Sequence, residues 1–175
     1  MKARPRRRLL VLRHAKSAWP PDVADHERPL APRGLRDAPA AGRWLCEADC
    51  LPDLVLCSTA RRARRTWELA AAQLGTPPPV RHEPRLYGAG VADLLEAVRE
   101  VPADIGTLLI VGHNPGLQEL VLALAGEAVG DARQRAGTKF PTSAIAVLTW
   151  RGVWADLRPG TALLTDVAVP RGAKH

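Results

Sequence analysis

The stretch Arg8-Leu-Leu-Val-Leu-Arg-His14 decides the fold, because it is a short apolar run that stops at an arginine and a histidine. Its composition predicts a buried β-strand over residues 8–13, followed by a polar, proline-containing loop. Two more runs of this kind occupy residues 53–58 and 107–111. Each run precedes a helical pattern, and strands that alternate with helices predict a mainly parallel sheet covered on both faces.

Helices are expected where apolar residues recur with a helical period. The first helix would bury one face, but Pro39 predicts that its regular part begins only near that residue. Ser58 or Thr59 is the expected N-cap of the second helix, and Asn114 that of the third, which would begin at Pro115. A weaker pattern covers residues 91–101. The three apolar faces are Leu35, Ala38, Gly42 and Leu45; Ala63, Trp67, Ala70 and Leu74; and Leu117, Leu120, Val121 and Leu124.

The last part of the chain predicts two strands, residues 144–150 and 153–157, joined by a hairpin turn at Gly152. These strands would add an antiparallel edge to the sheet. The fold class expected is therefore α/β: a three-layer α/β/α arrangement with a mainly parallel central sheet and an antiparallel C-terminal edge.

The composition is that of an ordinary globular protein, with 175 residues of which 46% are hydrophobic and 25% charged. This length suits one domain, expected over residues 8–160, between a basic N-terminal tail (1–7) and a C-terminal tail (169–175) that we expect to be disordered. Lys and Arg outnumber Asp and Glu by 25 to 18, and the net charge of +7 admits anionic partners of several kinds. No apolar run approaches the roughly 18–20 residues of a membrane span, so no membrane partner is expected.

The chain has three cysteines, Cys46, Cys50 and Cys57, and no CxxC pair. Three thiols exclude an all-cysteine zinc site, and no mixed Cys/His spacing typical of zinc is evident. We therefore expect reduced thiols in a cytoplasmic protein, with no metal and no cofactor.

Chemically active side chains follow all three predicted parallel strands. Arg13 and His14 follow the first strand, Ser58 and then Arg62 follow the second, and His113 follows the third. Ligands of such sheets bind outside the carboxyl ends of the strands, so these groups are expected to converge there. Guanidiniums bind phosphate oxygens in pairs, and helix N-termini favour anions. Phosphate is the ligand that this set fits best.

The segments around these residues resemble motifs of the histidine phosphatase superfamily, which has the phosphoglycerate-mutase-like fold. Leu12-Arg13-His14-Ala15 is similar to its Arg-His-Gly signature, residues 58–66 to its Ser-Pro-x-x-Arg-Ala-x-Gln-Thr segment, and Val111-Gly-His113-Asn114 to its second-histidine segment. Residues 28–34, with Arg28-Pro-Leu and Gly34, and residues 142–146 resemble the small SixA-type phosphohistidine phosphatases in particular. The resemblance covers about residues 8–158.

The resemblance implies two-step phosphoryl transfer without a metal. His14 would attack phosphorus as a neutral imidazole, and water would hydrolyse the phosphohistidine that forms. Arg13, Arg62 and His113 would hold the phosphoryl oxygens. The substrate-binding residues expected beside these four are Arg28, Ser17 and Asn114.

The general acid is the main departure from the family pattern. Many members place a glutamate in the segment that corresponds to residues 81–90, and here Glu83 lies nearby but out of register. Glu83 is therefore the first candidate for the acid, with Asp25 and Asp93 as alternatives. Without a placed acid, the site would prefer phosphohistidine, aryl phosphates or acid anhydrides, whose leaving groups are weakly basic.

Three functions are consistent with the sequence. The first is a SixA-like phosphatase acting on protein phosphohistidine. The second is a phosphatase of small molecules such as nucleotides, polyphosphates or sugar phosphates. The third is a noncatalytic module that binds phosphate or nucleic acid, which the basic N-terminus favours and the presence of a nucleophile disfavours. A phosphorylated substrate is thus the expected partner, and nucleic acid is not.

Overall fold

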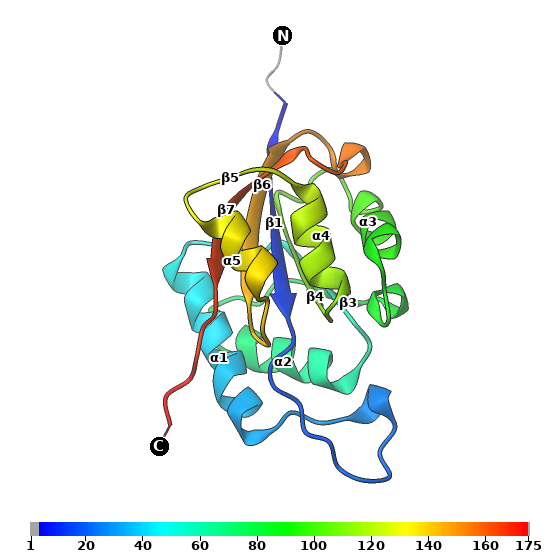
Figure 1. The fold of residues 1–175 in the computed structure, drawn as a ribbon, viewed down its shortest axis with the longest axis vertical. Helices are drawn as coiled ribbons and strands as arrows, with labels where there is room; N and C mark the ends of the chain where they lie inside the picture. Colours follow the sequence, from blue (N-terminus) through cyan, green and yellow to red (C-terminus); the bar gives the residue numbers. More distant parts are fainter. Residues whose placement is uncertain (1–3, 175) are drawn as a thin grey trace.

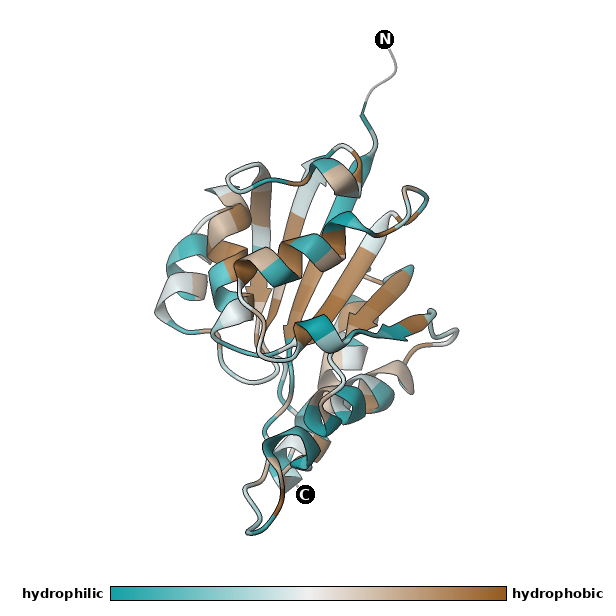
Figure 2. Cartoon of the chain, turned by 90° about the vertical axis from the view of Figure 1, so that its right-hand side faces the viewer, coloured by the Kyte–Doolittle hydropathy of each residue, from teal (hydrophilic) through white to brown (hydrophobic). Residues whose placement is uncertain are grey.

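A seven-stranded sheet forms the centre of the computed structural model, which describes residues 4–174 (Figure 1). The strand order across the sheet is β3-β2-β4-β1-β6-β7-β5. The strands are β1 (Arg6–Arg13), β2 (Leu54–Cys57), β3 (Val80–His82), β4 (Thr107–Gly112), β5 (Ala125–Ala128), β6 (Ile145–Arg151) and β7 (Ala162–Ala168). Figure 2 shows the central strands of this sheet as largely hydrophobic.

Helices cover both faces of this sheet, so the three-layer α/β/α arrangement predicted from the sequence is confirmed. On one face, α1 and α2 pack over apolar residues such as Leu10, Leu12 and Val55. On the other face, α3, α4 and α5 pack over residues such as Leu9 and Ile110. The helices are α1 (Pro32–Glu47), α2 (Arg61–Ala71), α3 (Val91–Arg99), α4 (Gly116–Leu124) and α5 (Ala132–Thr138), with short 3-10 turns η1 (Asp25–Glu27), η2 (Pro84–Leu86) and η3 (Trp154–Asp156). None of the helices described is long and apolar enough to cross a membrane.

The sheet is mainly parallel, with one reversed strand inside it. β1, β2, β3 and β4 are parallel neighbours, whereas β6 runs antiparallel to both β1 and β7. The outermost strand on that side is β5, which pairs parallel with β7. The antiparallel C-terminal part is therefore present, but its antiparallel strand is internal rather than at the edge.

The predicted hairpin at Gly152 is wrong. Residues 154–156 form η3 instead of a strand, and the strand that pairs with β6 is β7, which begins at Ala162. The reason is Trp154, which is fully buried and donates its indole N–H to the Ile105 carbonyl (2.7 Å). Burying this large side chain draws the segment off the sheet plane.

The expected domain and tail boundaries need correction at both ends. β1 begins at Arg6, inside the expected N-terminal tail, and β7 lies beyond residue 160. The expected C-terminal tail is also held in place over the residues described, because Asp37 accepts hydrogen bonds from the Gly172 N–H (2.9 Å) and from Arg171 (3.0 Å). Residues 1–3 and 175 of the two expected tails lie outside the described residues.

The first helix also departs from expectation. α1 begins at Pro32 and continues through Pro39. Proline at the first helical position costs no hydrogen bond, and burial of Ala38, Ala41 and Leu45 outweighs the bond lost at Pro39. Leu35, expected on the buried face, is 46% exposed.

Candidate active site

The predicted convergence at the carboxyl ends of the parallel strands is present. The ladder between β1 and β4 ends with His14 N–H donating to the Gly112 carbonyl (3.0 Å). The ladder between β2 and β4 ends likewise with Ser58 N–H donating to Val111 (2.9 Å). His113 directly follows Gly112, the last residue of β4, and its ring centroid lies 5.1 Å from that of His14. Backbone pairing thus brings two imidazoles and one hydroxyl to a single edge.

His14 is arranged as a neutral nucleophile. Its Nδ1 lies 2.7 Å from the Ala15 carbonyl oxygen, which can only accept, so Nδ1 carries the proton. The lone pair is therefore on Nε2. The side chain is buried, and this burial lowers the pKa of His14 to about 3, so the imidazole is uncharged at neutral pH.

His113 is arranged as a hydrogen-bond donor. Its Nε2 lies 2.8 Å from Oγ of Ser58, and its Nδ1 is buried with no partner among the residues described. Burial lowers the pKa of His113 to about 4. When the Ser58 hydroxyl donates to Nε2, the proton of the neutral ring lies on Nδ1 and is free for a bound anion. Ser58 does not serve as the predicted N-cap of α2, because Ala60 holds that position.

Three arginines of this edge carry N–H groups without partners. In the described part of the chain, Nε of Arg13, Nε of Arg62, and both Nε and Nη1 of Arg28 are buried and donate no hydrogen bond. Buried polar groups are normally paired, so such a concentration of donors is typical of a site that binds an oxyanion. The guanidiniums are fixed from behind by carbonyl and hydroxyl oxygens: Phe140 O for Arg13 (3.2 Å), Asp25 O for Arg62 (2.7 Å) and Ser17 Oγ for Arg28 (2.8 Å).

Asp25 links the two arginines contributed from outside β1. Its carboxylate accepts hydrogen bonds from Nη2 of Arg62 (3.2 Å) and from the Tyr87 hydroxyl. The carboxylate also lies 3.4 Å from Nε of Arg28. The Tyr87 hydrogen bond, followed by Arg62, holds the pKa of Asp25 below its usual value. Asp25 is therefore ionised and positions the cations.

Tyr87 was not found by sequence reasoning. Its ring meets the rings of His113 and His26 edge-on, with centroids 5.6 and 4.9 Å apart. The available signal was that the single tyrosine of the chain lies within residues 81–90, the segment searched for the acid.

Glu83 is not brought together with the other predicted catalytic residues. One carboxylate oxygen accepts from the Arg85 N–H (3.2 Å) and Nε (3.0 Å), and the other accepts from Arg85 Nη2 (3.0 Å). These bonds hold the pKa of Glu83 below its ordinary value. Asp93 likewise serves its own helix, accepting from the Gly90 N–H (3.1 Å). Both carboxylates thus make local capping contacts.

Asn114 supports the segment that holds Arg13. Its Nδ2 donates to the Phe140 carbonyl (2.8 Å), which Arg13 also contacts, and its Oδ1 accepts from the Gln118 N–H (3.2 Å). The expected capping role is therefore present, although Pro115, not Asn114, is the N-cap of α4. One N–H of Nδ2 remains available, so the expected substrate contact stays a prediction.

Two backbone contacts support the loop that follows His14. The Ala31 N–H donates to the Lys16 carbonyl (2.8 Å), and a Cβ built on Gly34 would lie 2.1 Å from that same oxygen. Only glycine permits this approach of α1. On the other side, the Ser143 N–H lies 3.1 Å from the carbonyl oxygens of both Arg13 and His14.

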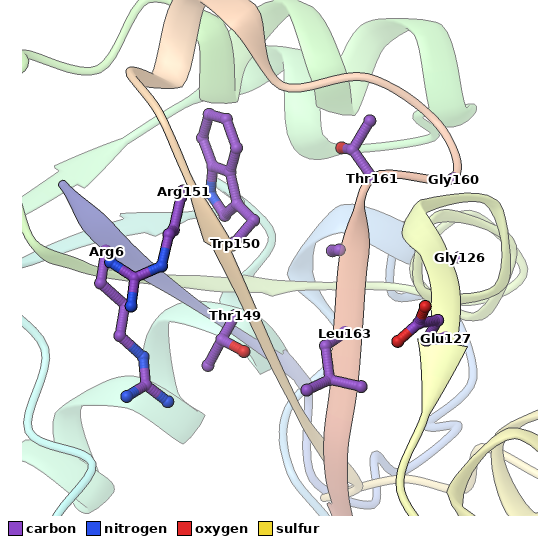
Figure 3. A pocket seen from close by; sticks show the side chains of 10 residues that line it. Arg6, Gly126, Glu127, Thr149, Trp150, Arg151, Gly160, Thr161 and Leu163 are labelled. Atoms are coloured by element: carbon purple, nitrogen blue, oxygen red, sulfur yellow. The ribbon is translucent and has the colours of Figure 1, made fainter. Parts of the chain in front are cut away.

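A separate pocket lies at the amino end of the sheet (Figure 3). It is lined by Arg6, Thr149, Arg151, Thr161 and Glu127, among others. Arg6 begins β1 whereas His14 follows its end, so this pocket is remote from the converging histidines. It contains none of the predicted site residues.

Comparison with known proteins identifies the family. Residues 9–140 match the model of the histidine phosphatase superfamily, branch 1. The uncharacterized protein Rv1276c of Mycobacterium tuberculosis is 48% identical over 162 residues, covering 91% of this chain and 100% of that protein. A protein of Nakamurella multipartita, provisionally named phosphohistidine phosphatase SixA, is 36% identical and superposes with a TM-score of 0.85, covering 97% of this chain and 99% of that one. A second protein with that provisional name, from Agrobacterium tumefaciens, gives 26% identity and a TM-score of 0.77, with 95% and 99% covered. The chain therefore belongs to branch 1 of the histidine phosphatase superfamily and is a SixA-like phosphatase.

Proposed function

We propose that this protein hydrolyses phosphoramidates and activated phosphate esters through a phosphohistidine on Nε2 of His14, and that its physiological substrate is a phosphohistidine-bearing protein. The observation that carries the proposal is a neutral, buried imidazole whose Nδ1–H is fixed to the Ala15 carbonyl beside three guanidiniums with free N–H groups. We place this activity in the cytoplasm, which the three unpaired cysteines support.

In the first step, the lone pair of His14 Nε2 attacks phosphorus, and the bond from phosphorus to the leaving group breaks. Arg13, Arg28 and Arg62 donate to the phosphoryl oxygens while their charge is redistributed, and His113 donates through Nδ1. In the second step, water attacks phosphorus and the bond from phosphorus to Nε2 breaks. Phosphate is released and neutral His14 is regenerated.

The substrate class follows from the carboxylates near the site. Glu83 is bonded to Arg85, and Asp25 is bonded to Arg62 and Tyr87, so both are ionised and neither carries a proton for a leaving group. General acid catalysis is worth roughly 10²–10⁴-fold for a basic leaving group such as an alkoxide. An imidazole leaving group, whose conjugate acid has a pKa of about 6.5, needs much less help. This supports phosphohistidine over sugar phosphates.

The proposal is tested by trapping the intermediate. Wild-type protein is mixed briefly with phosphoramidate, quenched in alkali and analysed by intact-protein mass spectrometry while released phosphate is counted. We expect one acid-labile phosphoryl group per chain together with turnover. His14→Ala should abolish both, whereas His82→Ala, which removes an exposed imidazole on β3, should change neither. Turnover by folded His14→Ala protein at the wild-type rate would refute the assignment.

A further inference from the structure

A groove is formed by the segment that follows Arg28 and by the first turns of α2, which also carries Arg62. It is lined by Pro29, Leu30, Leu35, Arg61, Arg64 and Arg65, with Glu27 and Glu68 at its margins. Arg61 adjoins Arg62 on the first turn of α2, and Pro29 adjoins Arg28. The two segments that supply Arg28 and Arg62 to the proposed active site therefore also supply residues to this groove.

The groove has an apolar side. Leu30 is buried, but Leu35 on the first turn of α1 is 46% exposed, and Pro29 lies between buried and exposed. On the other side of the same segment, Trp19 is 76% exposed, and the Arg28 guanidinium lies 3.3 Å from its ring centroid. Exposed leucine and tryptophan that flank a site are more typical of a protein-binding surface than of a site for a small phosphate.

The opposite side of the groove carries two cations without carboxylate partners. Arg64 donates through Nε to the Thr59 carbonyl (2.9 Å), and Arg61 contacts the Glu27 carbonyl (3.5 Å). Within residues 4–174, neither forms a salt bridge. Of the two acidic side chains at the margins, Glu68 pairs with Arg65, which also lines the groove (3.2 Å), and Glu27 pairs with His26 (3.0 Å). The carbonyl contacts orient Arg61 and Arg64 and leave their charge available.

We propose that this groove docks an acidic segment of the phosphorylated protein. Carboxylates of that segment would pair with Arg61 and Arg64, and an apolar side chain would pack on Leu30 and Leu35. The inference rests on the proposed function, because it takes the docked chain to carry the phosphohistidine that His14 attacks. It makes the partner an acidic protein and assigns its recognition to residues outside the chemistry.

The test uses two synthetic peptides of equal length, each with one histidine phosphorylated by phosphoramidate and one leucine nearby. One peptide surrounds these residues with Asp and Glu, and the other with Lys. We expect the wild-type protein to favour the acidic peptide by about 10-fold in kcat/KM, with a smaller preference at high salt. Arg61→Gln/Arg64→Gln should remove this preference and leave phosphoramidate hydrolysis unchanged.

Two controls separate docking from net charge and from folding. Arg43→Gln/Arg133→Gln removes the same charge from exposed residues of α1 and α5 and should keep the preference. Leu35→Gln should lower kcat/KM for both peptides and leave phosphoramidate hydrolysis unchanged. A wild-type protein that treats both peptides alike, or a preference that survives Arg61→Gln/Arg64→Gln, would overturn the docking proposal.

Binding of the unphosphorylated peptides, followed by fluorescence anisotropy, decides the groove independently of catalysis. Selective binding of the acidic peptide through Arg61 and Arg64 would support the groove even if phosphoramidate were not hydrolysed. A failure to hydrolyse phosphoramidate would then count against the proposed chemistry and not against the groove.

Discussion

Two buried arginines, Arg7 at the amino end of the sheet and Arg28 at its carboxyl end, show what separates a structural cation from a binding cation. Both are almost inaccessible, at 7% and 6% exposure. Arg7 donates to the carbonyls of Gly152 (3.0 Å) and Ile105 (2.7 Å) and so ties two loops to β1. Among the described residues, Arg28 donates a hydrogen bond only to Ser17; its Nε and Nη1 make none, although Nε lies 3.4 Å from the Asp25 carboxylate. Burial of charge is common to both ends, and free donors distinguish the site.

Exchanging each of these arginines for glutamine gives the largest contrast that we predict. Arg28→Gln should lower kcat/KM for phosphoramidate by about 100-fold, because donors to the phosphoryl oxygens are lost, with little change in stability. Arg7→Gln should lower the free energy of unfolding by about 1–3 kcal/mol and leave kcat/KM per folded molecule unchanged. Steady-state assays and urea unfolding measure the two effects. The reverse pattern would show that the free donors do not mark the site.

Asp25→Asn tests whether the binding cations must be positioned. We expect about a 10-fold loss in kcat/KM, because Arg62 and Arg28 lose the carboxylate that aligns them, and a smaller loss for Tyr87→Phe. A positioning role predicts equal losses for phosphoramidate and for an alkyl phosphate. A loss confined to the alkyl phosphate would instead identify Asp25 as the general acid.

The pH dependence should separate activity from stability. The pKa of His14 in the folded protein is about 3. Protonation of His14 should therefore not reduce kcat/KM between pH 8 and 5, once ionisation of the substrate is corrected for. Stability behaves differently. The folded pKa values of His14 and His113 lie below the unfolded value of about 6.5, so the unfolded chain binds more protons and stability falls as pH drops below about 6.5.

Urea unfolding across this pH range checks the second effect. His14→Gln should flatten the decline, because one of the two histidines no longer contributes to it. A loss of kcat/KM that follows an ordinary histidine titration near pH 6.5 would contradict the buried, neutral state of His14.

The smallest effect is expected at Glu83. Glu83→Gln should change kcat/KM less than about 2-fold for both phosphoramidate and an alkyl phosphate, since its carboxylate is committed to Arg85. Glu96→Gln, at another acidic residue near Arg85, is the matched control. A loss of 10-fold or more on the alkyl phosphate alone would restore Glu83 as the acid.

The sequence was most informative where local pattern and topology coincide. The runs that became β1, β2 and β4 are short and apolar, and parallel pairing alone brings the residues after them together, so His14, Ser58 and His113 could be placed without coordinates. The sequence was less informative after β6. There the strand-like pattern of residues 153–157 predicts a strand, but burial of Trp154 makes the segment a 3-10 turn instead.

Side-chain partners were harder to predict than strand ends. Asp25 meets Arg62 and Tyr87 across separations of 37 and 62 residues, which no local pattern encodes. Glu83 was sought as an acid by its place in the chain, yet its neighbour two residues later, Arg85, decides its state. The contact of Asn114 with the Phe140 carbonyl was missed for the same reason, since the two residues are 26 apart in sequence.

The C-terminal segment has a practical consequence for work with this protein. Asp37 is buried and holds Gly172 and Arg171, and Arg171 also donates to the Thr142 carbonyl (2.9 Å), next to the residue that contacts the backbone of His14. An affinity tag or truncation close to Gly172 would therefore disturb the contacts that hold the loop next to the nucleophile. Arg4 and Arg6 lie at the far end of β1, which makes the amino terminus the safer place for a tag or a surface tether.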